Sequence, residues 1–297
     1  MYDIIVIGGG PAGLTAALYA KRANKTVLVI EKGSFGGQIT YSPKVENIPG
    51  FLEVTGNEFS EKLVEQVLEQ GADVEIAEVT GITDGDVKTV HTDSGDFEAK
   101  AVIIATGARH RMLGLEGEER FIGEGISFCA VCDGAFYEGK TVAVIGGGNS
   151  ALQESLLLSD LAKKVYVIQN LDYFTGEEKL SDQLKAKENV EIILGATVES
   201  ILGDDELQGI VINKGGEKGE IPIDGMFVAI GLVPQNEPFS SVLDLNKWGY
   251  VEAGENCLTS KEGIFVAGDC RSKKIRQVAT AAADGAVAAL AACDYIG

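Results

Sequence analysis

The stretch Asp3-Ile4-Ile5-Val6-Ile7-Gly8-Gly9-Gly10-Pro11-Ala12-Gly13 decides the fold of this chain. Its β-branched first half predicts a buried parallel strand. Its second half matches the glycine-rich turn that binds a dinucleotide. In such a turn Gly8 makes the tight bend, Gly10 lets the backbone approach a pyrophosphate, and Gly13 lets the following helix pack closely on the strand. The N-terminus of that helix then faces the phosphates.

The residues after the turn complete a dinucleotide-binding unit. We expect a helix from Pro11 to about Ala23, and then a strand from Thr26 to Ile30 that ends at Glu31. Glu31 stands where an acid binds a ribose hydroxyl, about 20 residues after the glycines. A lone glycine motif is weak evidence, but strand, turn, helix, second strand and acid in register argue against coincidence.

A second copy of this pattern begins at Thr141. A strand over residues 141–145 enters a glycine turn over residues 146–151, an amphipathic helix follows, and a strand over residues 164–168 ends at Gln169. Gln169 takes the position of Glu31 in the first copy. A neutral amide offers no carboxylate to the ribose diol of NAD. The second copy therefore keeps the fold and lacks this element of nicotinamide-nucleotide recognition.

Two cysteines lie between the copies, in Ser127-Phe128-Cys129-Ala130-Val131-Cys132-Asp133-Gly134. Thiols separated by two residues can form and break a disulfide at one place. The alternative is half of a structural zinc site, which needs a second pair of Cys or His ligands. No such pair exists, because the other candidates are isolated in sequence: Cys257, Cys270, Cys293, His91 and His110. We therefore expect a redox-active disulfide and no metal.

Composition limits the domain count and the partners. A chain of 297 residues suggests two domains. Its net charge of −20 opposes binding to nucleic acid or to an anionic membrane, since both are polyanions. The chain runs into its first strand without a signal-peptide pattern, and the longest apolar stretch, Val278 to Cys293, is interrupted by Asp284 and short for a membrane span. We expect a cytoplasmic protein.

Other segments are assigned from their patterns. Residues 57–70 have helical spacing, and the alternating stretches Val74 to Val79 and Val87 to Thr92 predict an antiparallel sheet. The charged and glycine-rich residues from Arg109 to about Gly125 are typical of a linker. A strand that ends at Asp269 precedes the C-terminal helix, which runs to about Ala292.

The order of these motifs, over essentially the whole chain, resembles the low-molecular-weight thioredoxin reductases, a family of flavoprotein disulfide reductases. The resemblance implies an α/β fold of two Rossmann-like dinucleotide-binding domains of the FAD/NAD(P)-binding type, the second inserted into the first. It assigns FAD binding to residues 1–112 plus 240–297, and a degenerate NAD(P)-binding-type domain with the cysteine pair to residues 113–239. It also implies a homodimer. The residues that it assigns to FAD are Gly8, Gly10, Pro11, Ala12, Gly13, Glu31, Lys32, Gly37, Gln38, Asn47, Ala105, Thr106, Gly107, Gly268, Asp269, Arg276, Gln277, Val278 and Ala279.

The same resemblance implies roles at the cysteine pair. Cys132 would contact the flavin, Cys129 would attack the disulfide of thioredoxin, and Asp133 would protonate the departing thiolate or the flavin. A plainer role for Asp133 is that of a cap at the start of a helix after the cysteines.

The electron donor follows from a departure from the family pattern. Members that use NADPH carry a basic His-Arg-Arg stretch and a further Arg, where this chain has Gln169-Asn170-Leu171 and then Thr175. In this it is similar to ferredoxin-dependent flavin thioredoxin reductases, so we expect thioredoxin to be reduced with electrons from reduced ferredoxin. The alternatives are an NAD(P)H-dependent reductase with atypical nucleotide recognition, a dithiol oxidase that uses oxygen, and a flavin and thiol redox sensor without turnover.

An acidic ferredoxin needs a local basic surface on this acidic chain. Two basic stretches are candidates, and we expect them to form one docking surface: Arg109, His110 and Arg111, and Arg271, Lys273, Lys274 and Arg276. The alternative is that Arg276 contacts the cofactor and the others are solvated loop charges.

Overall fold

The computed structural model describes all 297 residues and divides the chain into two compact units. Unit 1 consists of Met1–Arg109 and Val233–Gly297, and unit 2 consists of His110–Leu232. Unit 2 is therefore inserted into unit 1. Unit 1 has a mixed, mostly parallel sheet and unit 2 a parallel one, and both carry helices, so the predicted α/β fold class is confirmed.

Unit 1 is organised around a long strand in its main sheet. The ten residues of β6 (Gly95–Ile104) pair antiparallel to β5 (Lys88–Thr92) at the start, and parallel to β1 (Tyr2–Ile7) and β17 (Ile264–Val266) at the end. The sheet has the order β3 (Asp73–Ile76), β2 (Val27–Glu31), β1 (Tyr2–Ile7), β6, β5 (Lys88–Thr92) and β4 (Val79–Thr83), with β17 (Ile264–Val266) also on β6. Parallel pairing brings the carboxyl ends of β1, β6 and β17 to one edge, where the glycine turn begins.

One predicted pairing is wrong. The residues around Val74 were expected to pair antiparallel with neighbouring strands, but β3 lies parallel to β2, with Val74 opposite Val29. The helix α2 (Gly56–Glu69) lies between these strands in sequence and carries the chain back, as in a crossover connection. Alternation of apolar and polar residues indicates a strand and does not give its direction.

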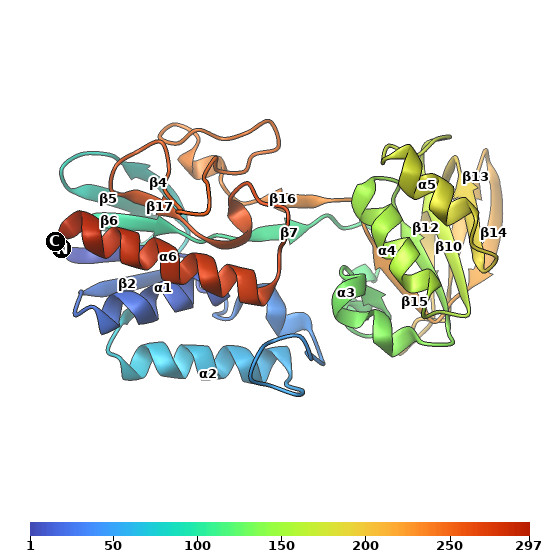
Figure 1. Ribbon diagram of the computed structural model, residues 1–297, viewed down its shortest axis with the longest axis horizontal. Coiled ribbons are helices and arrows are strands. Elements are labelled where there is room, and N and C mark those ends of the chain that lie inside the picture. Colours follow the sequence, from blue (N-terminus) through green and yellow to red (C-terminus); the bar gives the residue numbers. More distant parts are fainter. The chain divides into compact units, whose positions relative to one another are not determined.

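Helices α1 (Pro11–Arg22) and α6 (Val278–Ile296) lie side by side in unit 1, and both chain ends lie close together (Figure 1). Their contact uses small residues: a Cβ added to Gly285 would lie 2.2 Å from the carbonyl oxygen of Ala12. By length and composition alone α6 could cross a membrane, a test that core helices also pass. Because Ala288, Ala289 and Ala292 are buried in the same core as α1, the structure gives α6 the role of a core helix.

Unit 2 repeats this architecture on a five-stranded parallel sheet (Figure 1). Its order is β11 (Val190–Leu194), β10 (Lys164–Gln169), β9 (Thr141–Ile145), β15 (Gly225–Val228) and β8 (Ile126–Ser127). The helices α3 (Ala130–Asp133), α4 (Asn149–Ser159) and α5 (Glu178–Lys185) accompany it. A three-stranded antiparallel sheet, β12 (Ala196–Leu202), β13 (Gly209–Lys214) and β14 (Glu217–Pro222), packs on it through a shared apolar core. The strands β7 (Ala108–His110) and β16 (Leu232–Pro234) connect the units and pair with each other.

The predicted linker, from Arg109 to about Gly125, is folded, and all of it after Arg109 belongs to unit 2. Glu118 is only 3% exposed, and its carboxylate accepts backbone N–H groups of residues 113–115. Phe121 of the short helix η2 (Glu118–Phe121) is buried beside it. The charged and glycine-rich composition misled the prediction, because one of those charges is turned inward to bind backbone. Four further one-turn helices are η1 (Gly37–Tyr41), η3 (Gly134–Tyr137), η4 (Glu237–Phe239) and η5 (Gly268–Cys270).

Candidate active site

The first glycine turn has the geometry of a phosphate cradle. Gly8 has φ +114°, and a Cβ there would lie 2.3 Å from the carbonyl oxygen of Ala105. At Gly13 a Cβ would lie 1.8 Å from the carbonyl oxygen of Gly8, so only glycine fits either position. The space at Gly10 is open, since the nearest atom to an added Cβ is the Cα of Gly37 at 3.8 Å. No side chain caps the N-terminus of α1 and no acid lies in its first turn, so its N–H groups and dipole can bind an anion.

Glu31 ends β2 beside this turn. One carboxylate oxygen, Oε2, accepts the N–H of Gly9 at 2.8 Å, and the other accepts the N–H of Gly33 at 2.9 Å. The acid thus holds the glycine turn in addition to the role that its position predicts. Lys32, also predicted to contact the cofactor, lies on the surface, where its Nζ is 3.6 Å from a carboxylate oxygen of Glu78.

Other predicted cofactor residues of unit 1 lie close to this turn. The side-chain amide of Gln38 donates to the carbonyl oxygen of Ala108. Gly268 has φ +79°, and a Cβ there would lie 2.8 Å from the Cβ of Ala12. Thr106 precedes Gly107, and its hydroxyl donates to Asn236 Oδ1 at 3.1 Å. Asn236 is fully buried and was missed from the sequence, because a single Asn in a loop carries no motif.

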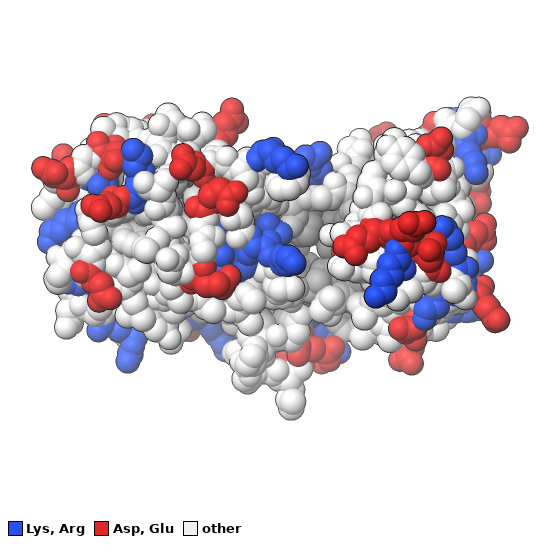
Figure 2. All heavy atoms as spheres, turned by 45° about the horizontal axis from the view of Figure 1, so that its top comes forward, with Lys and Arg blue, Asp and Glu red and all other residues white.

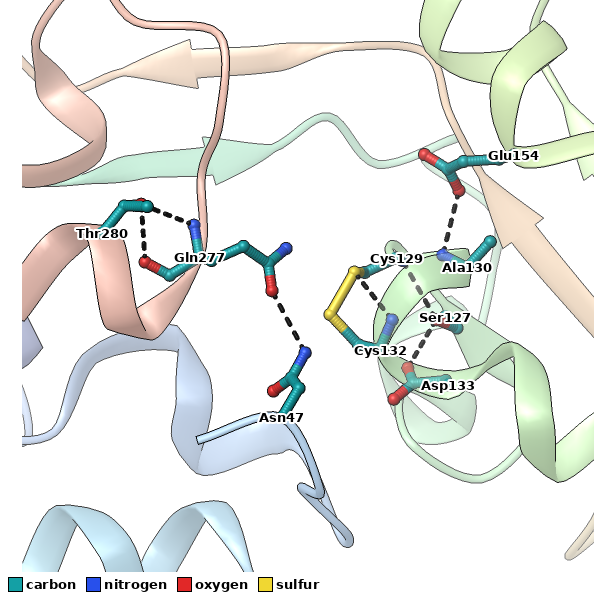
Figure 3. The surroundings of a disulfide bond; sticks show 9 residues. All are labelled: Asn47, Ser127, Cys129, Ala130, Cys132, Asp133, Glu154, Gln277 and Thr280. Atoms are coloured by element: carbon teal, nitrogen blue, oxygen red, sulfur yellow. Dashed lines mark hydrogen bonds between the residues drawn. A yellow bond between two sulfur atoms is a disulfide. The ribbon is translucent and has the colours of Figure 1, made fainter. Parts of the chain in front are cut away.

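The start of α6 is tied to the loop that contains Asn47. The Asn47 amide donates to Gln277 Oε1 at 3.1 Å, as Figure 3 shows. Gln277 is the N-cap of α6, and its backbone N–H donates to Thr280 Oγ1 at 3.2 Å. Val278 and Ala279 are the first two residues of the helix, so their backbone belongs to its N-terminal turn.

Two buried polar atoms in this region have no hydrogen-bond partner, and they test whether a polar cofactor fits. They are Asp269 Oδ1 and Arg276 Nε. Burial raises the pKa of the Asp269 carboxyl, and the charges of Lys273 and Arg276 oppose that rise. Native proteins rarely leave buried polar atoms unpaired, so an acceptor and a donor left over near a glycine cradle indicate a polar ligand. The residues present fit a dinucleotide such as FAD.

Two residues of the expected basic docking surface are buried, so the prediction is wrong for them. Arg271 is only 1% exposed, and its guanidinium binds the buried Asp284 through Nε at 2.8 Å. Lys273 Nζ lies 2.8 Å from the same carboxylate, with a side chain that is 6% exposed. Burial alone would raise the pKa of Asp284, but the hydrogen bonds from these two cations lower it. Figure 2 shows small, separate groups of basic side chains among acidic ones.

His110 also departs from the expected docking surface. Its ring stacks on Phe128 with centroids 4.6 Å apart. Burial lowers the pKa of His110 to about 4, so the ring is neutral at physiological pH. Arg109, Arg111 and Lys274 remain exposed.

In unit 2, Cys129 and Cys132 form a disulfide at the start of α3 (Figure 3). Their Cα atoms are 5.3 Å apart. Cys129 is the N-cap of the helix, and its Sγ accepts the N–H of Cys132 at 3.2 Å. Both residues are half-buried. The N-terminus of a helix stabilises a negative charge, so this position favours the thiolate that Cys129 forms after reduction.

Asp133 lies beside this disulfide in a chain of hydrogen bonds. The Ser127 hydroxyl donates to Asp133 Oδ2 at 2.6 Å, and the N–H of Cys129 donates to that hydroxyl at 3.1 Å. The other oxygen, Oδ1, is buried without a partner. Burial raises the pKa of Asp133, and the bond from Ser127 opposes the rise. Its side chain caps neither α3 nor η3, so the capping alternative is wrong, and a carboxyl that holds its proton more tightly is available as an acid.

A second acid, Glu154 of α4, was not predicted. Its Oε2 accepts the N–H of Ala130, the residue between Cys129 and the helix interior, at 3.2 Å (Figure 3). Burial raises the pKa of Glu154 to about 7, against the effect of that hydrogen bond. The signal in the sequence is weak, because a Glu in an amphipathic helix is ordinarily a surface residue.

The second glycine turn repeats the first in shape and differs in its acid. A Cβ on Gly146 would lie 2.5 Å from the carbonyl oxygen of Ala229, as at Gly8. Gln169, at the end of β10, is 6% exposed and lies against Gly147, where an added Cβ would be 2.5 Å from its Nε2. That amide donates to the carbonyl oxygen of Tyr173 at 3.4 Å. Gln169 is thus directed onto its own turn.

The surroundings of the three isolated cysteines do not favour a reactive thiolate. Burial raises the pKa of Cys257 and of Cys270 to about 11, and also raises that of Cys293. Their thiols are therefore protonated and unreactive near neutral pH. No group of three or more His, Cys, Asp or Glu side chains is arranged to hold a metal ion.

Comparison with known proteins agrees with this site. The family model for pyridine nucleotide-disulphide oxidoreductases matches residues 2–285. The chain is 42% identical to a 34.2 kDa protein in the rubredoxin operon of Clostridium pasteurianum, over 99% of this chain and 97% of that protein. It is 40% identical to thioredoxin reductase of Bacillus subtilis, over 100% of this chain and 95% of that protein. The crystal structure of thioredoxin reductase from Streptococcus pyogenes superposes with a TM-score of 0.95 at 38% identity, covering 99% of this chain and 98% of that one.

The matched residues include both glycine turns and the two cysteines. The alignments cover nearly all of this chain and nearly all of each relative. This chain therefore belongs to the pyridine nucleotide-disulphide oxidoreductases and, among them, to the low-molecular-weight thioredoxin reductase family.

Proposed function

We propose that this protein reduces the disulfide of thioredoxin through FAD and the Cys129–Cys132 dithiol, and that its electrons come from reduced ferredoxin. The cofactor of the family is FAD. The observation that carries the proposal is the disulfide at the N-terminus of α3, with the carboxyl of Asp133 held nearby by Ser127. Relatives 40–41% identical over the whole chain are thioredoxin reductases.

The residues of unit 1 would hold the cofactor through its phosphates and polar groups. The uncapped N-terminus of α1 would bind the pyrophosphate, and Asp269 and Arg276 would offer it and its neighbouring groups an acceptor and a donor. When bound, FAD supplies the conversion between single electrons and electron pairs that thiols alone cannot perform.

The residues of unit 2 would carry out the exchange. Once the disulfide is reduced, the Cys129 thiolate attacks a sulfur of the thioredoxin disulfide and forms a mixed disulfide, releasing one thioredoxin thiolate. Cys132 then attacks Cys129 Sγ, which reforms the Cys129–Cys132 bond and releases the second thiolate. Asp133, whose pKa is raised by burial, donates a proton to a departing thiolate.

The choice of ferredoxin is supported by the second glycine turn. Neither Gln169 nor Asn170 and Leu171 offers a carboxylate or an arginine to a nicotinamide nucleotide. The side chain of Gln169 is also engaged with Tyr173 within its own unit.

A second candidate is an NAD(P)H-dependent reductase with atypical nucleotide recognition. It is favoured by the second glycine turn, which keeps the open geometry of the first at Gly148, where the nearest atom to an added Cβ lies 3.8 Å away. A homodimer and a cytoplasmic location are further parts of the proposal, supported by the resemblance to the family alone.

Mixing the purified protein anaerobically with NADPH, NADH or reduced ferredoxin tests the donor, with loss of the visible flavin absorbance as the readout. Only ferredoxin should bleach the flavin rapidly, and added thioredoxin should then restore the absorbance as it is reduced. Rapid bleaching by NADPH would favour the second candidate. Bleaching of the flavin without reduction of thioredoxin would favour a redox sensor. Turnover in which oxygen, and not thioredoxin, accepts the electrons would favour a dithiol oxidase.

A further inference from the structure

The disulfide helix and Glu154 form an arrangement that the proposed exchange does not use. Glu154 lies on α4, which packs against α3, and its carboxylate accepts the backbone N–H of Ala130. Ala130 follows Cys129 directly, and Cys129 Sγ accepts the N–H of Cys132 from the same helical turn. A carboxylate and a redox-active sulfur therefore accept different N–H groups of one four-residue helix, those of Ala130 and Cys132.

No cation compensates this carboxylate. Glu154 takes part in no ion pair, and the shift of its pKa has burial as its main cause, with only the Ala130 hydrogen bond against it. The ionisable side chains on the elements packed against α4 are Asp133 of α3, Glu178, Lys179, Asp182 and Lys185 of α5, and Lys164 and Tyr166 of β10, while β9 has none. Lys164 and Lys185 are each paired with another acid.

We propose that Glu154 is a positioning residue that takes up a proton when the Cys129–Cys132 disulfide is reduced, and so links the redox equilibrium of the disulfide to pH. The inference rests on the proposed function for its biological meaning. A new negative charge on one of the two sulfur atoms repels the nearby carboxylate. This repulsion raises the pKa of the carboxyl, which therefore binds a proton. Near neutral pH the carboxyl is poised for this change.

The disulfide and the Glu154 carboxylate together receive two electrons and two protons. The S–S bond breaks and gives one thiol, one thiolate and the protonated Glu154 carboxyl. Without an ionisable group at this position, only one proton accompanies the two electrons. In the test below the reductant is dithiothreitol, which loses two electrons and two protons as its own thiols close to a disulfide.

The decisive variant is Glu154→Gln, which keeps an oxygen for the Ala130 N–H and removes the charge. The FAD-loaded protein is equilibrated with reduced and oxidised dithiothreitol over a series of pH values, and the free thiols are counted by alkylation. Below the pKa of Glu154, about 7, the variant and the parent should be reduced to the same extent. Above it, the ratio of reduced to oxidised variant should exceed that of the parent by up to tenfold over the first pH unit, which equals about 30 mV.

Glu138→Gln is the matched control, since it removes the same charge from an exposed residue six positions after Cys132 and should leave the parent curve unchanged. An infrared difference spectrum of reduced minus oxidised protein gives a second measure. Reduction just above the pKa should produce the band of a protonated carboxyl in the parent and in the control, and not in Glu154→Gln.

Parallel redox curves for the parent and Glu154→Gln at every pH, or an unchanged carboxyl band, would overturn the inference and leave Glu154 a purely structural acceptor. Neither thioredoxin nor an electron-transfer protein enters the experiment. A failure of the proposed function would therefore show in the turnover assay and not here.

Discussion

Lys273→Glu should destabilise unit 1 strongly, although its position among basic residues suggested a surface charge. Lys273 Nζ lies 2.8 Å from Asp284 Oδ2, and both side chains are more than nine-tenths buried. The substitution removes one of the two cations that hold this carboxylate and places a second carboxyl against it. Lys274→Glu changes the same charge at the next residue, which is exposed, and serves as the control.

The magnitude follows from the protonation state that the variant must adopt. Two carboxyls in contact cannot both ionise, so one must hold its proton at neutral pH, which raises its pKa by roughly 3 units and costs about 4 kcal/mol. This lies within the range of about 3–5 kcal/mol for breaking a buried ion pair. Lys274→Glu should stay within about 0.5 kcal/mol of the parent.

Urea unfolding followed by flavin fluorescence measures the difference. A loss of about 4 kcal/mol corresponds to a fall of the midpoint by roughly 1–2 M. The deficit should shrink at acid pH, because the introduced carboxyl has a raised pKa in the folded state and so binds more protons there than in the unfolded state. Equal midpoints for Lys273→Glu and Lys274→Glu at neutral pH would refute the buried cluster.

The remaining predictions concern chemistry. The protein should release FAD and not FMN on denaturation, as judged by chromatography, because its first glycine turn fits a pyrophosphate. Cys129→Ser or Cys132→Ser should abolish thioredoxin reduction with FAD still bound, whereas Cys257→Ala should turn over normally; an active Cys129→Ser enzyme would contradict the exchange. NADPH and NADH should reduce the flavin slowly in stopped flow, since each charge-assisted contact missing around Gln169 forgoes about 1.5–3 kcal/mol, and rapid reduction at micromolar NADPH would contradict this. Asp133→Asn should slow thiol exchange most at low pH, where the parent carboxyl is protonated, and should remove the decline in rate as pH rises through its raised pKa; an unchanged pH profile would exclude it as the acid.

The sequence predicted those parts of the fold that depend on local chemistry. The two glycine turns were found because only glycine fits beside the carbonyl oxygens of Ala105 and Ala229. The direction of β3 was missed, since alternation along a strand is the same in parallel and antiparallel pairs. The folding of residues 110–125 was missed because it depends on one buried acid, Glu118, whose partners are backbone N–H groups.

At the candidate site the sequence located the cysteines and Asp133 beside them, but not the other contacts of the site. The pairing of Lys273 with Asp284 joins residues on either side of the start of α6, and nothing in the basic run marks which charges are turned inward. Glu154 reaches Ala130 across 24 positions. Contacts of this kind depend on how helices and strands pack against each other. A single sequence indicates where an element lies in the chain, but not which element packs against it.

The hydrogen bond from the Arg111 N–H to the carbonyl oxygen of Gly231, at 3.0 Å, brings the two ends of unit 2 together. A segment whose ends meet can be cut out and its neighbours rejoined by a short link, because little chain entropy is spent in closing the gap. Residues 110–232 are therefore suited to expression as a free-standing disulfide module. The same junction is the natural place at which to exchange this module for that of a relative with a different electron donor.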